Sequence, residues 1–485
     1  MNKTQNVERP ILIEGFNMGG ISDSKFSGIK NSLYKLIGWD MHSTPALLKT
    51  AQKMTKNSGS TVTEFCKCRV ASTNGCTYWG SSSSGKIWER ASDGTWTLVI
   101  TITAAAGGVN ILGMFEYQGY IYIATESRLH RIASTHTGST AWGANIALNW
   151  ATFTKTDALY HPMTEQNLVL FIGDGNQVAQ VDGSTFSANA MDIGTPLRIK
   201  TLGKIGTDLL IGTWVSDNIT KTRVFRWNTW SVSFTSSDEI DEVGINAFLE
   251  ADNIVYINAG LQGNIYVYDG EKLELFRKIS GDYSPTATAL VNPNAVANLG
   301  GQILFGVSNG TGNPCDQGVY RIGRHSRNYP YIMDLPYPIS QRNSTEFVLT
   351  NLEIGAVLVV GSNILVSWKD STGTPAYGVD ILDYSNKLDG AYFETRIMSI
   401  DREIFTNFTK FLVAYASLPS STAINISYSK NYASYVATTE KSDPDRLIVY
   451  SEAEGVEANV LQMKVAITAS SNTAPEIESA AVFIK

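Results

Sequence analysis

The chain has 485 residues, of which 17% are charged and 43% hydrophobic, and its formal net charge is −7. That length can bury a sizeable core without disulfides, and the negative charge argues against a nonspecific nucleic-acid binder, whose affinity comes from neutralising phosphates. The low charged fraction, with abundant Gly, Ser, Thr and Asn, is typical of many short strands joined by turns. It also suits a subunit covered by neighbours, because charge is depleted at interface cores.

The first segment, residues 1–58, is predicted to be an arm with one short helix. Its opening lacks the basic and apolar regions of a signal peptide, and no stretch of about 18 apolar residues predicts a membrane span. We therefore expect synthesis in a cytoplasm and no membrane insertion. A helix is predicted over residues 43–54, because Thr44 can cap it, Pro45 suits its first position, and Leu47, Leu48 and Ala51 recur at helical spacing.

Two of the four cysteines lie close together, at Cys66 and Cys68. They alternate along a predicted strand and share one face, and no second pair completes the spacing of a zinc site. With Cys76 and Cys315, they are interpreted as buried thiols in a reducing compartment, so no metal is expected.

A repeated unit dominates residues 59–388. An apolar strand is followed by a turn and by a second strand with alternating large side chains. The apolar strands start at residues 76, 120, 168, 209, 254, 303 and 364. The second strands are predicted at residues 85–90, 127–132, 177–182, 222–227, 263–268, 317–322 and 377–382.

The spacing of these units, roughly 40–60 residues, is close to that of four-stranded propeller blades. Stacking blades radially covers faces that one blade cannot bury alone, so we predict an all-β protein with a β-propeller of about seven blades. Runs such as residues 168–173 and 208–212 are apolar apart from Asp208 and are predicted to be the inner strands. The alternative is an assembly of β-sandwiches. The repeat carries neither a WD40 nor a kelch signature, so the propeller prediction rests on the spacing and pattern of the strands.

The pattern changes at residue 389, where shorter alternating strands begin. Six strands in the last part of the chain, separated by turns rich in Pro, Ser and Asp, predict an antiparallel β-sandwich over residues 389–485.

No catalytic motif stands out. No phosphate-binding loop or nucleophile elbow occurs, and the five histidines show no metal spacing: His42, His130, His136, His161 and His325. Residues 236–242 hold four carboxylates. We interpret this run as a solvent-exposed loop, although two of its carboxylates, if held at the separation found in glycosidases, could catalyse glycoside hydrolysis. We therefore expect no catalytic residue and no cofactor.

Two features keep carbohydrate chemistry open. Residues 92–96 are similar to the Asp-box turn of sialidases, and repeat-equivalent arginines would form a ring if they converged: Arg90, Arg131, Arg226 and Arg321. Trp227 and Trp230 are candidates for a sugar-stacking or partner-contacting platform, with core packing as the alternative.

The order of these segments resembles that of structural proteins of tailed bacteriophages. The resemblance lies in residues 15–24 with their Gly-Gly pair, in residues 39–43 and in residues 61–65, followed by the blades. In the tail nozzle, neck and hub proteins of short-tailed phages an N-terminal arm similarly precedes a propeller. The resemblance implies a virion subunit, assembled in the host cytoplasm and placed in the tail.

We therefore expect a non-enzymatic platform that acts in virion assembly and in DNA passage or host attachment. Its expected partners are other virion proteins (tail, portal or adaptor) and further copies of itself in a ring, without sequence-specific nucleic-acid binding. One alternative is a receptor-binding tail protein that holds a host surface glycan. Another is a propeller glycosidase.

Overall fold

The computed structural model describes residues 8–45, 47–155, 158–215, 221–251, 254–310, 312, 314–341, 351–399, 405–438 and 447–485. The chain divides into two compact units. The propeller unit comprises residues 55–318 and 348–381, and the sandwich unit comprises residues 1–54, 319–347 and 382–485. Within the described residues, no helix is long and apolar enough to cross a membrane.

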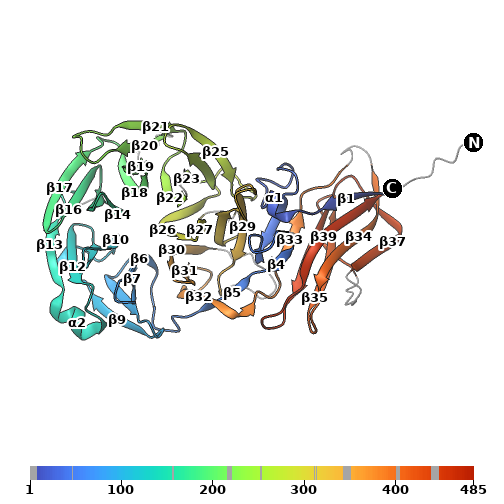
Figure 1. Cartoon of the computed structure of the whole chain (residues 1–485), viewed down its shortest axis with the longest axis horizontal. Coiled ribbons are helices and arrows are strands. Elements are labelled where there is room, and N and C mark those ends of the chain that lie inside the picture. The colour runs from blue at the N-terminus through green and yellow to red at the C-terminus, as the bar shows by residue number, and fades with distance from the viewer. Residues whose placement is uncertain are drawn as a thin grey trace, which may run out of the picture. The chain divides into compact units, whose positions relative to one another are not determined.

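The propeller unit is built from four-stranded sheets arranged as blades around a centre (Figure 1). The first three are β6(Cys66–Ala71)-β7(Thr77–Ser81)-β8(Lys86–Arg90)-β9(Trp96–Thr101), β10(Gly113–Tyr117)-β11(Tyr120–Ala124)-β12(Arg128–Ala133)-β13(Ala147–Thr152) and β14(Met163–Gln166)-β15(Val169–Asp174)-β16(Gln177–Asp182)-β17(Thr185–Asp192). The others are β18(Arg198–Ile205)-β19(Asp208–Trp214)-β20(Thr222–Trp227)-β21(Ser236–Ile240), β22(Ile245–Ala251)-β23(Ile254–Ala259)-β24(Asn264–Tyr268)-β25(Leu273–Lys278) and β30(Leu352–Val360)-β31(Asn363–Asp370)-β32(Ala376–Lys387)-β5(Gln52–Lys56). The β-propeller prediction is confirmed. One blade combines β30 to β32 with β5, which comes immediately before β6 in the chain, so the last blade takes one strand from the beginning of the chain and the ring is closed.

The blade count differs from the prediction, because the structure has six separate four-stranded blades and not about seven. The strands of the predicted sixth repeat are divided between the units. β26 (Ala289–Leu299) pairs with β27 (Gln302–Asn309) in the propeller unit. β28 (Gly318–Gly323) pairs with β29 (Ile332–Tyr337), and both fall almost entirely in the sandwich unit. Repeat spacing locates strands along the chain, but it does not determine which sheet they join.

The apolar runs at residues 168–173 and 208–212 are not the inner strands that we predicted. They form β15 and β19, the second strands of their sheets, while β14 and β18 lie nearer the centre (Figure 1). A second strand is covered on both faces and paired on both edges, so it is apolar throughout. The inner strand β18 instead alternates between half-buried and buried residues along its length.

Second strands share a small residue where neighbouring blades touch. A Cβ added at Gly80, Gly173 or Gly212 would lie within 3.0 Å of a side chain of the neighbouring blade. Gly306 in β27 is the tightest such position, because its Cβ would lie 2.3 Å from Cγ2 of Ile354 on β30. Glycine lets the sheets approach closely at these points.

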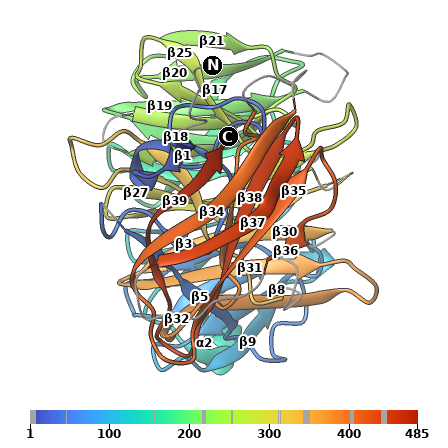
Figure 2. The same ribbon diagram turned by 90° about the vertical axis from the view of Figure 1, so that its right-hand side faces the viewer.

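The sandwich unit contains two facing sheets. One has the order β3(Trp39–Asp40)-β4(Leu48–Thr50)-β39(Glu476–Ile484)-β34(Thr406–Ser417)-β37(Leu447–Ala458), and β1(Arg9–Ile13) also pairs with β39. Figure 2 shows β39, β34 and β37 side by side. The other runs β28-β29-β2(Leu33–Ile37)-β33(Tyr392–Thr395)-β38(Leu461–Thr468)-β35(Ala423–Lys430)-β36(Val436–Ala437). The rings of Phe411 and Tyr428 stack between β34 and β35 with centroids 5.1 Å apart. The C-terminal strands are confirmed.

The described residues of the predicted arm, 8–45 and 47–58, do not form an arm, because β1 to β4 are strands of the sandwich sheets. The helix predicted over residues 43–54 is wrong. This stretch forms β4 and the start of β5, and Leu48 pairs with Ile477 while Lys49 pairs with Glu476. Pairing with a distant strand outweighs a weak local helix preference. Among the residues that the structure describes, the helices are α1 (Phe16–Gly19) and α2 (Gly138–Asn145), together with a 3-10 turn at Ala104–Ala106.

Candidate functional site at the centre of the propeller

An irregular segment of β26 enters the centre of the propeller. Val291 pairs with Val307 and Val296 pairs with Phe305, so four residues, 292–295, lie opposite a single residue of β27. Pro293 lies at the middle of this bulge, as expected for a residue that cannot donate a ladder hydrogen bond.

Hydrogen bonds tie the bulge to two other inner strands. Asn292 Nδ2 donates to the carbonyl of Ile354 on β30 at 2.6 Å, and Asn294 Nδ2 donates to the carbonyl of Lys67 on β6 at 3.0 Å. The segment therefore crosses part of the centre and is held on both sides.

Arg69 of β6 strengthens the same junction. Its guanidinium donates to the carbonyls of Val357 at 2.7 Å and Val296 at 2.8 Å. Burial lowers the pKa of Arg69 to about 10, yet these two carbonyls compensate part of the lost hydration.

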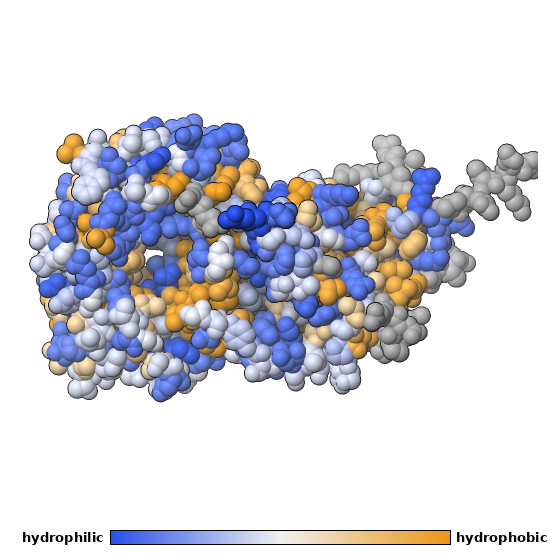
Figure 3. Space-filling model, in the orientation of Figure 1, coloured by the Kyte–Doolittle hydropathy of each residue, from blue (hydrophilic) through white to orange (hydrophobic). Residues whose placement is uncertain are grey.

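A hollow of about 300 Å³ opens on one side of the bulge. This is the lower end of the size range of small-molecule sites. Figure 3 shows an opening in the middle of the propeller with hydrophilic residues around it and a hydrophobic stretch along one side. Inner strands and the loops next to them supply the polar lining, which includes Lys67, Asn110, Glu126, Tyr160, Lys200 and Asn292.

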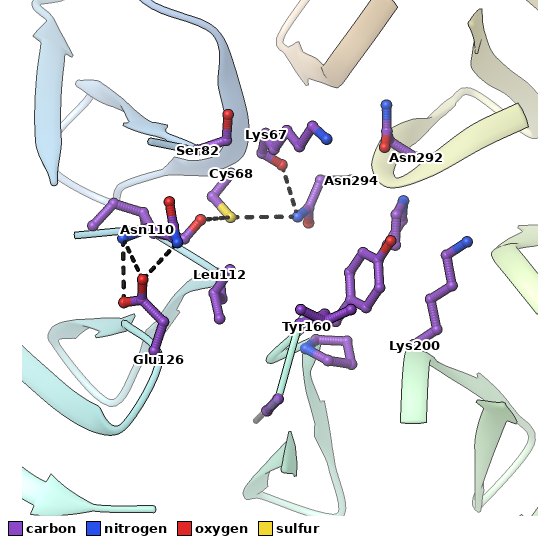
Figure 4. Close-up of a pocket in the computed structure, with 15 residues that line it drawn as sticks. Lys67, Cys68, Ser82, Asn110, Leu112, Glu126, Tyr160, Lys200, Asn292 and Asn294 are labelled. Atoms are coloured by element: carbon purple, nitrogen blue, oxygen red, sulfur yellow. Dashed lines mark hydrogen bonds between the residues drawn. The ribbon is translucent and has the colours of Figure 1, made fainter. Parts of the chain in front are cut away.

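Tyr160, Lys200 and Asn292 lie together on one side of the hollow, and Asn110 and Glu126 lie opposite (Figure 4). Lys200 Nζ donates to Oδ1 of the buried Asn246 at 2.7 Å and lies 5.4 Å from the centre of the Tyr160 ring. Burial, and then the charge of Lys67, lower the pKa of Lys200 to about 8. Burial raises the pKa of Tyr160.

The carboxylates of this region have partners of their own. Glu126 accepts hydrogen bonds from the backbone N of Asn110 at 3.1 Å and from its Nδ2 at 2.5 Å. Glu353, beside the adjoining hollow, forms an ion pair with Lys369 at 3.1 Å.

The predicted buried thiols are confirmed, since the chain's four cysteines are all buried and none forms a disulfide. Cys68 borders the hollow, and its Sγ donates to the carbonyl of Ile111 at 3.2 Å. Burial raises the pKa of Cys68 to about 12, so the thiol is a weak nucleophile. Among the residues that the structure describes, no group of three His, Cys, Asp or Glu side chains could hold a metal ion.

Two buried histidines of the propeller unit, His130 and His161, have partners within the core. The backbone N of Asn149 donates to Nδ1 of His130 at 3.0 Å, so the proton of the neutral ring lies on Nε2, which is 3.2 Å from Thr125 Oγ1. His161 stacks on Phe153 at 4.0 Å.

The remaining histidines lie apart from these two. Nδ1 of His325 donates to the carbonyl of His42, and His42 is buried in the sandwich unit. His136 is half-buried in the propeller unit, and its carbonyl accepts hydrogen bonds from Tyr78 and Trp142.

The carboxylates of residues 236–242 do not form an isolated solvated loop, because most of this run is β21, the fourth strand of its blade. Glu239 forms ion pairs with Lys221 and Arg223 at 2.7 and 3.4 Å. Glu242 instead accepts a hydrogen bond from Asn264 Nδ2 at 2.5 Å. The cluster is therefore distributed along an edge.

The four repeat-equivalent arginines do not converge. Arg90 donates to Asn57 Oδ1 at 2.7 Å, Arg131 lies over the rings of Tyr120 and Trp150, and Arg226 binds Asp208. The fourth, Arg321, is buried in the sandwich unit with Asp334 and Asp40. The Asp-box-like residues 92–96 form a turn in which the backbone N of Thr95 donates to Asp93 Oδ1 at 2.8 Å.

Trp227 and Trp230 occupy different environments. Trp227 is 2% exposed and packs against Phe171 with ring centroids 5.4 Å apart. Trp230 is 82% exposed, and Val232 is 97% exposed. The two indoles therefore do not share one exposed stacking surface, and only Trp230 is available to a partner.

The turn that carries Trp230 is ordered by its own hydrogen bonds. Asn228 Oδ1 accepts from the backbone N of Trp230 and of Ser231, both at 3.0 Å, and Trp227 Nε1 donates to the carbonyl of Ser231 at 2.8 Å. We call the exposed side chains Leu168, Trp230 and Val232 the apolar tip.

Leu168, which is 76% exposed, belongs to the neighbouring blade's β14–β15 turn. The two turns are joined by Asn167 Nδ2, which donates to Thr229 Oγ1 at 3.0 Å. The apolar tip is thus carried on two turns, from neighbouring blades, that this hydrogen bond joins.

Sequence reasoning missed Lys67, Tyr160, Lys200 and the bulge. These residues come from different blades and have no common spacing, so only the fold brings them together. One signal was present, because a proline inside the β-strand pattern, Pro293, predicts a bulge that re-aims its neighbours.

No known protein family and no curated protein matches the chain. Its structure is similar to that of virginiamycin B lyase from Staphylococcus aureus, with 13% sequence identity and a TM-score of 0.43 over 65% of this chain and 95% of that one. It is also similar to the WD40 repeats of RRP9, with 10% identity and a TM-score of 0.46 over 69% of this chain and 98% of that one. At these identities the likeness is one of fold alone.

Proposed function

We propose that this chain is a non-enzymatic structural subunit of a tailed-bacteriophage virion, in which the propeller is a rigid platform for other virion proteins. The observation that carries the proposal is the apolar tip. Exposed apolar side chains on an ordered turn are typical of protein contact sites, and tryptophan is enriched among the residues that dominate binding energy.

The tip is suited to binding because little order has to be gained on contact. Asn228 and Trp227 already hold the turn, and the hydrogen bond between Asn167 and Thr229 holds the two blades' turns together. A preorganised surface loses less conformational entropy when a partner binds.

If the subunit contributes to DNA passage, the DNA would run through a ring formed by several subunits and not through the centre of one propeller, because that centre holds a small hollow and is partly crossed by the bulge. The hollow beside the bulge is about 300 Å³, the size of a small-molecule site. The bulge itself is tied across to β6 and β30.

The test is complementation of a phage that lacks this gene. We expect the double variant Trp230→Ser, Val232→Ser to fold like the unaltered chain and to be lost from purified particles. Leu275→Ser is the matched control, because Leu275 is 60% exposed on β25, a strand of a blade that contributes nothing to the tip. Normal incorporation of the double variant would refute the role of the tip, and absence of the unaltered chain from particles would refute the proposal as a whole.

A further inference from the structure

We propose that the hollow at the centre of the propeller binds an anionic ligand, a carboxylate or phosphate group held by Lys67 and Lys200 beside the ring of Tyr160. This site is separate from the apolar tip, and it does not depend on the virion role.

The first support is unbalanced positive charge. Within the described part of the chain, neither Lys67 nor Lys200 lies within ion-pair distance of a carboxylate, and the carboxylates that line the hollow and the adjoining one, Glu126 and Glu353, are engaged by Asn110 and Lys369. Both lysines are half-buried, and an ammonium group that is partly removed from water is stabilised by an opposite charge. Two ammonium groups facing one half-buried hollow repel each other, and a bound anion would relieve that repulsion.

The second support is that the ammonium of Lys200 is held in place. Its acceptor, Asn246 Oδ1, belongs to a side chain that is 2% exposed and that donates to Asn258 Oδ1 at 3.0 Å and to the carbonyl of Gly260 at 2.7 Å. This chain of hydrogen bonds fixes the amide orientation, so Lys200 is directed by a buried group and not by solvent.

The third support concerns the neighbouring surfaces. Tyr160 and Asn292 lie on the same side of the hollow as Lys200 (Figure 4), and Lys67, Tyr160, Lys200 and Asn292 all line the adjoining hollow as well. A small anionic molecule with a ring would find a charge partner, an aromatic surface and an amide in one place. The hollow is too small for a folded partner.

The experiment is calorimetric titration of the full chain with three probes: inorganic phosphate, glucuronate and glucose. We expect phosphate and glucuronate to bind and glucose not to bind. The variants Lys67→Met and Lys200→Met are each expected to weaken binding about tenfold, because a hydrogen bond from a charged donor is lost. Lys272→Met is the control, because it removes the same charge from an exposed lysine that pairs with Glu274 on the fifth blade.

Glucuronate and phosphate also distinguish the source of the anion. If Tyr160→Leu weakens glucuronate but not phosphate, the ligand is a ring-bearing carboxylate. If phosphate binds more tightly than glucuronate and Tyr160→Leu changes the affinity for neither probe, the ligand is a phosphate. In either case, NMR titration should show the pKa of Lys200 rising above about 8 when the anion is bound. The proposal is wrong if no anion binds at tens of millimolar, if glucose binds equally well, or if the lysine variants bind like the unaltered chain.

Discussion

At the scale of single residues, a network of three charged side chains lies inside the sandwich unit. Arg321 is 3% exposed and binds Asp334, which is fully buried, while its Nη2 lies 2.9 Å from Asp40 Oδ1. Although burial alone would raise it, the charge of Arg321 holds the pKa of Asp334 at about 2. The network joins segments from two distant parts of the chain, so it contributes to the fold and not to a site.

Removing one member of this network should be costly. We expect Asp334→Asn to lower the free energy of unfolding by about 3 kcal/mol, because Arg321 is left buried with incomplete compensation. Urea unfolding measures the change. Lys410→Met is the control, since its ion pair with Glu8 is solvent-accessible and should contribute far less to stability. A loss for Asp334→Asn no larger than that of the control would contradict this account.

His130 gives a pH dependence of stability. Burial lowers its pKa from 6.5 to about 4 in the folded chain, so the unfolded chain takes up this proton first as the pH falls. Stability should therefore decrease from about pH 6.5 down to about pH 4. Between pH 7 and 4.5 this group accounts for about 2 kcal/mol of the loss.

The measurement is urea unfolding at both pH values for the unaltered chain and for His130→Gln. The variant should be less stable at pH 7, but its loss between the two pH values should be about 2 kcal/mol smaller. An equal loss in both proteins would show that His130 is not the responsible group.

At the scale of elements, the small residues of the second strands set the distance between blades. Gly306 faces Ile354 of β30 so closely that even a methyl group has no room. This feature recurs in the sequence as a glycine at the end of an apolar run, for example at Gly173 and Gly212. The sequence alone does not show that each of these glycines faces a side chain of the neighbouring blade.

Two glycine-to-alanine substitutions separate packing from backbone effects. Gly306→Ala should lower the free energy of unfolding by about 1–3 kcal/mol, because the added methyl group overpacks the contact. Gly143→Ala, in α2 with nothing within 4 Å of the added Cβ, should instead stabilise the chain by about 0.5–1 kcal/mol. Thermal unfolding of both variants measures the contrast, and destabilisation of equal size in both would contradict it.

Elements with strong apolar patterns were predictable, whereas their partners were not. The strands of the repeat and the C-terminal strands lie close to where periodicity places them, because alternation and turn residues are local signals. The helix at residues 43–54 failed because Leu48 and Thr50 are buried in a sheet with β39, which lies far along the chain. The lysine pair of the hollow was not predicted at all, since Lys67 and Lys200 come together only through the fold.

At the scale of the whole molecule, the chain crosses between its two units more than once. The sandwich unit takes residues 1–54, 319–347 and 382–485, in place of the consecutive segments 1–58, 59–388 and 389–485 that we expected. The strand β5 closes a blade with β30 to β32, and the preceding strands complete the sandwich sheets. A change in composition along the sequence cannot show that the chain comes back to a unit that it has already left.

This architecture predicts the effect of removing residues 1–55. The truncated chain loses β1 to β4 and nearly all of β5, so we expect it to be insoluble or to lose its cooperative thermal transition. Circular dichroism and light scattering on the purified product test this. A soluble, folded product with an unchanged melting temperature would show that the segment is a detachable arm after all.

The central claim is that this propeller chain is a structural component of a virus particle. The most direct test is quantitative mass spectrometry of gradient-purified phage particles from a host that carries the gene. The account predicts that the chain is present in a fixed number of copies relative to the major capsid protein, in every preparation. Its absence from the particles, with the protein found only free in the lysate, would contradict the account.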